Sequence, residues 1–138
     1  MAFDAEIERV YQLMDADDYD TAETLILRLR RAGCVRSELL LFEALCSYER
    51  ADDVRCLELI TQFLKKAPNH GKRYYALFTA SVCLINLGLE KRARRLLEQV
   101  PPSYPDREKE MKFLRSILSK KKRAAEWADE ILKMLGEP

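Results

Sequence analysis

The feature that most constrains the fold of this chain is a pair of amphipathic helices that recurs about every 34 residues. A small residue stands just inside the second helix of each pair. These residues are Ala22, Cys56, Ala93 and Ala124, at spacings of 34, 37 and 31. A period of this length with two apolar helical stripes is typical of a helical solenoid. Solenoids present an extended concave surface, so the repeat indicates a binding protein.

Apolar residues at i, i+3, i+4 and i+7 predict two helices in each repeat, and turn-forming residues stand at their ends. Ser37 is expected to cap a helix, and either Asp52 or Asp53 is expected to begin another. Gly33 and Gly88 are expected to follow helix ends. The predicted hairpins cover residues about 3–32, 37–67, 72–100 and 105–135, and the Lys-rich run 120–123 is the expected turn of the last one. The sequence therefore predicts an all-α fold of about eight helices in a single domain, 1–138.

Composition and charge argue against several classes of protein. The net charge is only +1, so no global field steers the chain toward nucleic acid or membrane. No apolar run reaches the length that a transmembrane helix needs. The cysteines are Cys34, Cys46, Cys56 and Cys83, and they form no CxxC pair. We therefore expect no metal site, and we expect reduced thiols in a reducing, cytoplasmic compartment.

The third hairpin resembles the tetratricopeptide (TPR) family. The matching positions are Leu77, Ala80, Ser81, Leu84, Gly88, Ala93 and Leu97, which fall where that family places large apolar, close-packing, turn and small residues. Glu43 and Cys56 depart from this pattern in the second hairpin. In the last hairpin Lys112 and Arg115 stand at positions that normally face inward, so this hairpin is interpreted as a helical cap. The resemblance implies a TPR-like right-handed superhelix of about four helical hairpins and a protein-binding scaffold.

Two narrower resemblances are weaker. The segments 44–46, 52–55, 72–75 and 91–95 look similar in order and spacing to the mitochondrial fission adaptor family. That family is tail-anchored, and no anchor precedes Pro138, so the resemblance implies either an adaptor without its anchor or only a shared repeat. In size and architecture the chain also resembles the TPR-like chaperones of type III secretion, which hold a hydrophobic helix of a needle subunit.

If the hairpins stack as TPRs do, the first helix of each lines a concave groove. The predicted partner-binding groove consists of Tyr11, Leu41, Leu45, Tyr48, Tyr75, Phe78, Val82 and Ile85. These side chains are apolar or aromatic, so the expected ligand is an amphipathic or hydrophobic helix of another protein. Two alternatives stay open: the C-terminal helix fills the groove, or the register of the groove is wrong by one residue.

A basic cluster near the C-terminus supports a further alternative, a ribosome- or RNA-associated factor. The possible anion contacts are Lys109, Lys112, Lys120, Lys121, Lys122 and Arg123. The other interpretation of this basic cluster is a turn whose charged side chains are simply solvated. Trp127 has the spacing of a core anchor, and His70 has no partner nearby in sequence for catalysis. We therefore expect a protein that is no enzyme, uses no cofactor, and acts as a scaffold, an adaptor or a chaperone. A subunit of a larger assembly is a further hypothesis.

Overall fold

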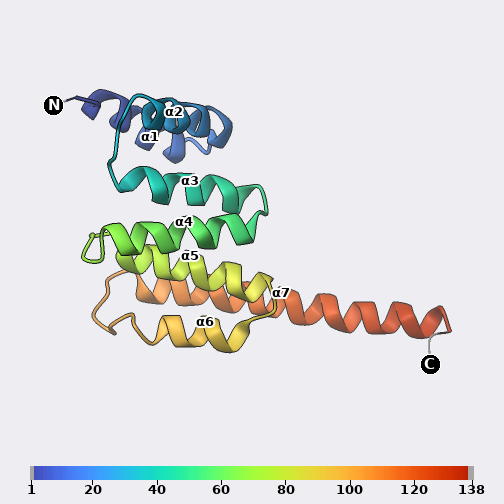
Figure 1. Cartoon of the computed structure of the whole chain (residues 1–138). Coiled ribbons are helices and arrows are strands. Elements are labelled where there is room, and N and C mark those ends of the chain that lie inside the picture. Colours follow the sequence, from blue (N-terminus) through green and yellow to red (C-terminus); the bar gives the residue numbers. More distant parts are fainter. Residues whose placement is uncertain (1, 137–138) are drawn as a thin grey trace. The chain divides into compact units, whose positions relative to one another are not determined.

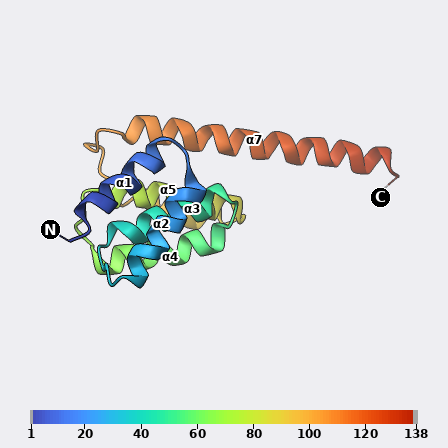
Figure 2. The ribbon, with the colours of Figure 1, turned by 90° about the horizontal axis from the view of Figure 1, so that it is seen from above.

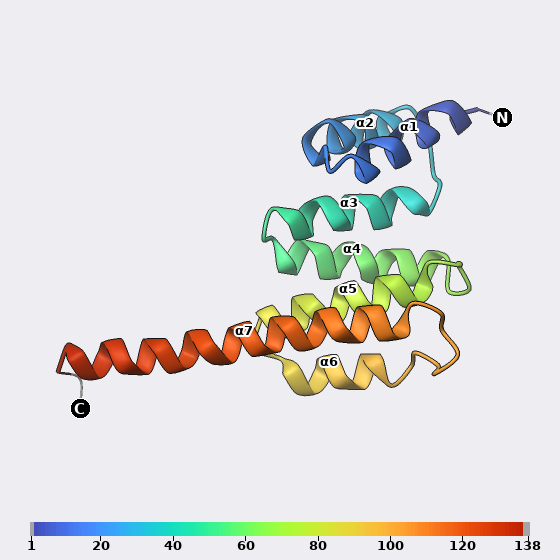
Figure 3. The same cartoon turned by 180° about the vertical axis from the view of Figure 1, so that it is seen from behind.

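The computed structural model describes residues 2–136 and is all-helical in that range, with seven helices. The chain forms two compact units, one up to Leu97 and one from Glu98 onward. The first unit contains α1 (Asp4–Asp15), α2 (Tyr19–Arg31), α3 (Glu38–Glu49), α4 (Asp53–Lys66), α5 (Arg73–Asn86) and α6 (Glu90–Leu97). Each helix packs against the next one in the chain, so the six helices stack in sequence order with alternating direction (Figures 1 and 3). This sequential antiparallel packing confirms the all-α prediction for the first three hairpins.

Local sequence explains where these helices begin and end. The carboxylates of Asp18 and Asp52 each accept a hydrogen bond from the backbone N–H three residues on, at 3.3 and 3.1 Å, and so cap α2 and α4. Gly33 and Gly88, each one residue beyond the residue that caps a helix end, adopt φ of +90° and +83°, a conformation that costs glycine little. Ser37 precedes α3, but its side chain makes no capping hydrogen bond, so that detail of the prediction was wrong.

The small residues of the first three repeats are buried in the packing between helices. Ala22, Cys56 and Ala93 are buried on α2, α4 and α6. Opposite Ala93, the Ser81 hydroxyl donates to the carbonyl oxygen of Leu77 at 2.8 Å and lies 3.5 Å from that of Ala93. Such contact requires side chains no larger than serine on both helices, because a longer side chain would force the backbones apart. The repeat in the sequence is thus a packing requirement.

Glu43, a departure from the repeat, is a buried carboxylate on α3. Its oxygens accept from Arg30 of α2 and, at 3.5 Å, from Arg55 of α4. The arginine side chains remain 39% and 43% exposed, whereas the Glu43 side chain is only 9% exposed. One carboxylate therefore joins three successive helices, and the position is polar because it holds an ion-pair cluster.

The second unit contains α7 (Arg107–Met134), one uninterrupted helix of 28 residues (Figure 2). The prediction of a fourth hairpin with a turn at residues 120–123 was therefore wrong, and the described residues form seven helices instead of eight. No glycine or proline lies between Pro105 and Gly136, and lysine, arginine and alanine favour helix. A run of lysines is polar, but without a backbone-breaking residue it does not interrupt a helix. Among residues 2–136, no helix is long and apolar enough to cross a membrane.

Candidate functional site: partner-binding surfaces

The residues predicted to form the groove fall into two groups. Leu41, Phe78, Val82 and Ile85 are buried, each at 4% exposure or less. Leu41 belongs to a core cluster that α3, α4 and α5 share. The other group, Tyr11, Leu45, Tyr48 and Tyr75, keeps part of its surface exposed. Of the predicted groove, these four residues are the ones that offer accessible surface to a partner in the described conformation.

One member of this group, Tyr11, lies where α1 meets α3 and the residue before α5. The Tyr11 ring of α1 meets Phe42 of α3 edge to face, with ring centroids 4.6 Å apart. The ammonium of Lys72, just before α5, lies 5.9 Å from the centroid of the same ring. Burial raises the pKa of the Tyr11 and Tyr48 hydroxyls, so both stay protonated and able to donate a hydrogen bond at neutral pH.

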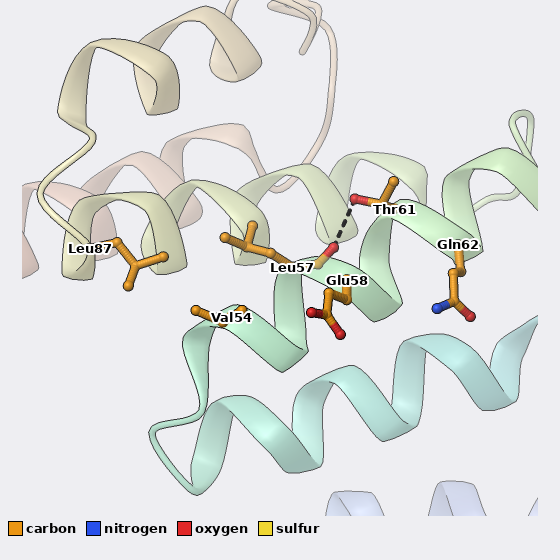
Figure 4. A pocket seen from close by; sticks show the side chains of 6 residues that line it. All are labelled: Val54, Leu57, Glu58, Thr61, Gln62 and Leu87. Atoms are coloured by element: carbon orange, nitrogen blue, oxygen red, sulfur yellow. Dashed lines mark hydrogen bonds between the residues drawn. The ribbon is translucent and has the colours of Figure 1, made fainter.

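A second surface is an open pocket on the outer side of α4, with a volume of about 570 Å³. Figure 4 shows its lining, which comprises Val54, Leu57, Glu58, Thr61, Gln62 and Leu87. Val54 is 55% exposed and Leu87 is 42% exposed, so these apolar side chains face solvent. The Thr61 hydroxyl donates to the carbonyl oxygen of Leu57 at 2.8 Å, which satisfies its polar group within the helix. The result is an apolar hollow with polar groups at its edge.

No expectation from the sequence included this pocket. The lining residues of α4 are spaced i, i+3, i+4, i+7 and i+8, so they form a stripe of their own. The core stripe of the same helix runs through Cys56, Leu59, Ile60 and Phe63, all of them buried. Val54 lies off that core stripe, and this was the available signal. Glu58 contributes a carboxylate at the pocket that pairs with Arg55 at 3.4 Å.

The basic residues proposed as anion contacts all lie on α7. Residues 120–123 follow one another in a helix, so each side chain is rotated by about 100° from the last and the run surrounds the helix. Lys109 and Lys112, three residues apart, share one side of it. The six side chains therefore do not form one flat cationic patch.

His70 has a structural environment. Its Nδ1 accepts from the backbone N–H of Lys72 at 3.0 Å, which leaves Nε2 to donate toward Glu38 at 3.4 Å. Its ring also lies edge to face on Phe63, at 5.1 Å between centroids. The imidazole thus links the loop before α5 to α3. Within residues 2–136, no group of three or more histidine, cysteine and acidic side chains is arranged to hold a metal ion.

The four cysteines are free thiols and all are buried. Burial raises the pKa of Cys46 to about 12, and its Sγ lies 3.7 Å from the carbonyl oxygen of Tyr19. A hydrogen bond with the neighbouring thiol of Cys56, together with burial, also raises the pKa of Cys83. The thiols of Cys46 and Cys83 are therefore protonated packing groups at neutral pH.

Trp127, which the sequence suggested as a core anchor, is 66% exposed on α7. That interpretation was wrong. The spacing of Trp127 identifies the apolar face of a helix, but it does not show that another part of the chain buries this face. Comparison with models of known protein families, with curated proteins and with solved structures finds no match to this chain.

Proposed function

We propose that this protein is a non-enzymatic scaffold that binds a segment of another protein, and that the pocket on α4 is a contact site. The observation that carries the proposal is the exposure of Val54 and Leu87 beside a hollow of about 570 Å³. A hollow lined by apolar side chains with a few polar groups at its edge has the composition of a ligand site. The stacked helices supply a rigid frame for it.

The shape and chemistry of the pocket favour an apolar anchor of an amphipathic helix. The hollow is open and shallow, which suits one large aliphatic or aromatic side chain presented from a helix. Glu58 and Gln62 lie at its edge and favour a lysine, arginine or amide next to that anchor. A buried anchor with a polar rim is the usual energetic arrangement of such interfaces.

The proposal includes a TPR-like arrangement of the three hairpins. Its support is the burial of Ala22, Cys56 and Ala93 at helix contacts, which is the packing that the TPR resemblance implies. In that arrangement another contact surface lies on α1, α3 and α5, the first helix of each hairpin. This tyrosine surface consists of the partly exposed Tyr11, Leu45, Tyr48 and Tyr75. An adaptor that holds two segments of a partner, one on each surface, is the form of scaffold that we propose.

The test is selection of helical peptides of about four turns from a displayed library. We expect peptides with an apolar anchor flanked by a basic residue, whose binding persists from about 0.15 M to about 1 M salt because it is mainly apolar. The double variant Val54→Glu with Leu87→Glu should weaken binding at least about tenfold, since it places carboxylates beside the anchor.

The matched control is Val35→Glu, which changes another exposed valine that does not line the pocket. All variants should keep the helical circular dichroism of the wild type, because the altered side chains are exposed. If the double variant binds normally and Tyr75→Ala abolishes binding, the pocket proposal is wrong and the partner uses the tyrosine surface. A peptide whose binding disappears at high salt would contradict the apolar mode of recognition.

A further inference from the structure

From Ile117 onward, α7 carries a mainly apolar stripe, in which Trp127 and Met134 are exposed and Ile117 and Ile131 are half-buried. Trp127 is 66% exposed and Met134 is 82% exposed. Together with Ile117, Lys120, Ala124 and Ile131 they occur at alternating spacings of three and four residues, and 117, 124 and 131 take heptad position a. This is the spacing of a coiled-coil seam, in which the stripe of one helix packs against that of another.

From this pattern we infer that two copies of the chain associate through α7, with the two helices antiparallel. The inference is independent of the proposed partner pocket, which lies in the other unit. In the alignment that we propose, Trp127 of each copy packs opposite Ala124 of the other, so a large side chain meets a small one twice. Ile131 then meets the aliphatic stem of Lys120, whose ammonium reaches solvent, and Met134 meets Ile117.

Charge selects this alignment. Arg123 and Glu130 occupy the g positions beside the seam, and neither has an ion-pair partner within residues 2–136. In an antiparallel coiled coil the g positions of the two helices face each other. The proposed alignment places Arg123 opposite Glu130 of the second copy, and this pairing occurs twice because the dimer is symmetric.

Other alignments of the same two helices lack this complementarity. A shift by one heptad in one direction puts Arg123 opposite itself, and a shift in the other direction puts Glu130 opposite itself. A parallel pair would place Lys120 against Lys120 in the seam and would set Arg123 beside Ala128. The order of charges along α7, basic at 120–123 and acidic at Glu126, Asp129 and Glu130, is therefore self-complementary only when the two helices run antiparallel.

The same order of charges disfavours an anionic membrane as the occupant of this face. Interfacial helices that bind such membranes carry lysine and arginine along their polar side. Here three carboxylates follow the basic run within the segment that holds Trp127 and Ile131. A second copy of the chain offers a partner for both signs of charge, whereas an anionic surface attracts one and repels the other.

The experiment is analytical ultracentrifugation of the full chain, together with emission from Trp127, its only tryptophan. We expect a concentration-dependent dimer and a blue shift of the emission as the dimer forms, because the indole leaves water. A chain that stays monomeric up to about 100 µM would overturn the inference. So would a blue shift that occurs only when vesicles of phosphatidylcholine and phosphatidylserine are added, because the face would then be membrane-directed.

Charge reversal tests the alignment. Arg123→Glu and Glu130→Arg should each weaken dimerisation about tenfold or more, because each places like charges opposite each other twice. An equimolar mixture of the two variants should restore it. In the mixed dimer one helix carries carboxylates at both g positions and the other carries guanidinium groups at both, so each contact again joins opposite charges.

The controls for charge reversal are Lys122→Glu and Asp129→Arg. These two positions lie on the outer side of the helix, one residue before each g position, so the substitutions should leave the dimer unchanged. Failure of the mixture of Arg123→Glu and Glu130→Arg to recover dimerisation would overturn the antiparallel alignment.

Discussion

The Glu43 cluster gives a prediction about which partner in a buried ion pair matters most. Glu43 is buried, whereas the side chains of Arg30 and Arg55 remain partly exposed. Replacement of Arg30 by methionine therefore leaves a buried carboxylate whose remaining guanidinium contact is long, at 3.5 Å to Arg55. Replacement of Glu43 by methionine leaves two arginines that water can still solvate. Both substitutions remove the contact between Arg30 and Glu43, and Glu43→Met also removes the contact to Arg55, yet Arg30→Met should cost more.

The magnitude follows from the burial of the three side chains. A hydrogen bond to a charged group contributes about 1.5–3 kcal/mol, and a buried charge left without its partner adds a desolvation cost. Arg30→Met should therefore lower the free energy of unfolding by about 2–3 kcal/mol, a figure kept below that of a fully buried pair because Arg30 is partly solvated. Glu43→Met should change it by less than about 1 kcal/mol, since a well-packed apolar replacement is often neutral.

Urea unfolding followed by circular dichroism measures both variants and their double mutant. In the Glu43→Met background, Arg30→Met should cost less than about 0.5 kcal/mol, so the coupling energy is about 2 kcal/mol. Arg28→Met is the control, because this exposed arginine of the same helix forms no ion pair within residues 2–136. Equal and additive costs for Arg30→Met and Glu43→Met would refute the argument from burial.

Three further predictions concern the caps and the thiols. Asp52→Ala should lower the free energy of unfolding by about 1 kcal/mol, because it removes the cap of α4. Ser37→Ala should lower it by less than about 0.5 kcal/mol, because Ser37 makes no capping hydrogen bond. Equal costs in urea unfolding would contradict the assignment of the caps. All four cysteines should resist a thiol reagent at about pH 8 in the folded protein and react after unfolding in guanidinium, and rapid modification of the folded chain would show that the core opens. The free energy of unfolding should fall as pH rises from about 9 toward 12, by at most about 1.4 kcal/mol per pH unit for one thiol. The Cys46 thiol of the unfolded chain loses its proton first, whereas the folded thiol, with a pKa of about 12, keeps it. The dependence of the unfolding free energy on pH should therefore be weaker in Cys46→Ala. An unchanged dependence would exclude Cys46 as its source.

The helices of the first unit were predictable because each rests on a local signal. Apolar spacing set their faces, and Asp18, Asp52, Gly33 and Gly88 set ends that the structure confirms. Glu43 was visible in the sequence as a departure from the repeat, but its meaning was not. The arginines that hold it lie 13 residues before it and 12 residues after it, and only the packing of three helices brings them together.

The predictions about exposure failed for a different reason. Periodicity identifies which side of a helix is apolar, and it identified the stripe of α7 through Trp127 and Ile131. It does not say whether the same chain covers that side, because cover depends on where the next turn falls. The predicted turn at residues 120–123 would have folded a short helix carrying Trp127 back onto its neighbour. Without that turn the helix continues, and Trp127 stays exposed on it.

The same reasoning explains why the two proposed surfaces leave unequal signals in the sequence. The pocket on α4 depends on Leu87, which follows α5, so it exists only once α4 and α5 have packed. The self-complementary face of α7 depends on nothing but one helix: heptad spacing, the Trp127–Ala124 match in size and the Arg123–Glu130 match in charge are all local. A surface of the second kind can be recognised in the sequence as soon as the helix is known to be continuous, and the continuity of α7 is what the structure adds.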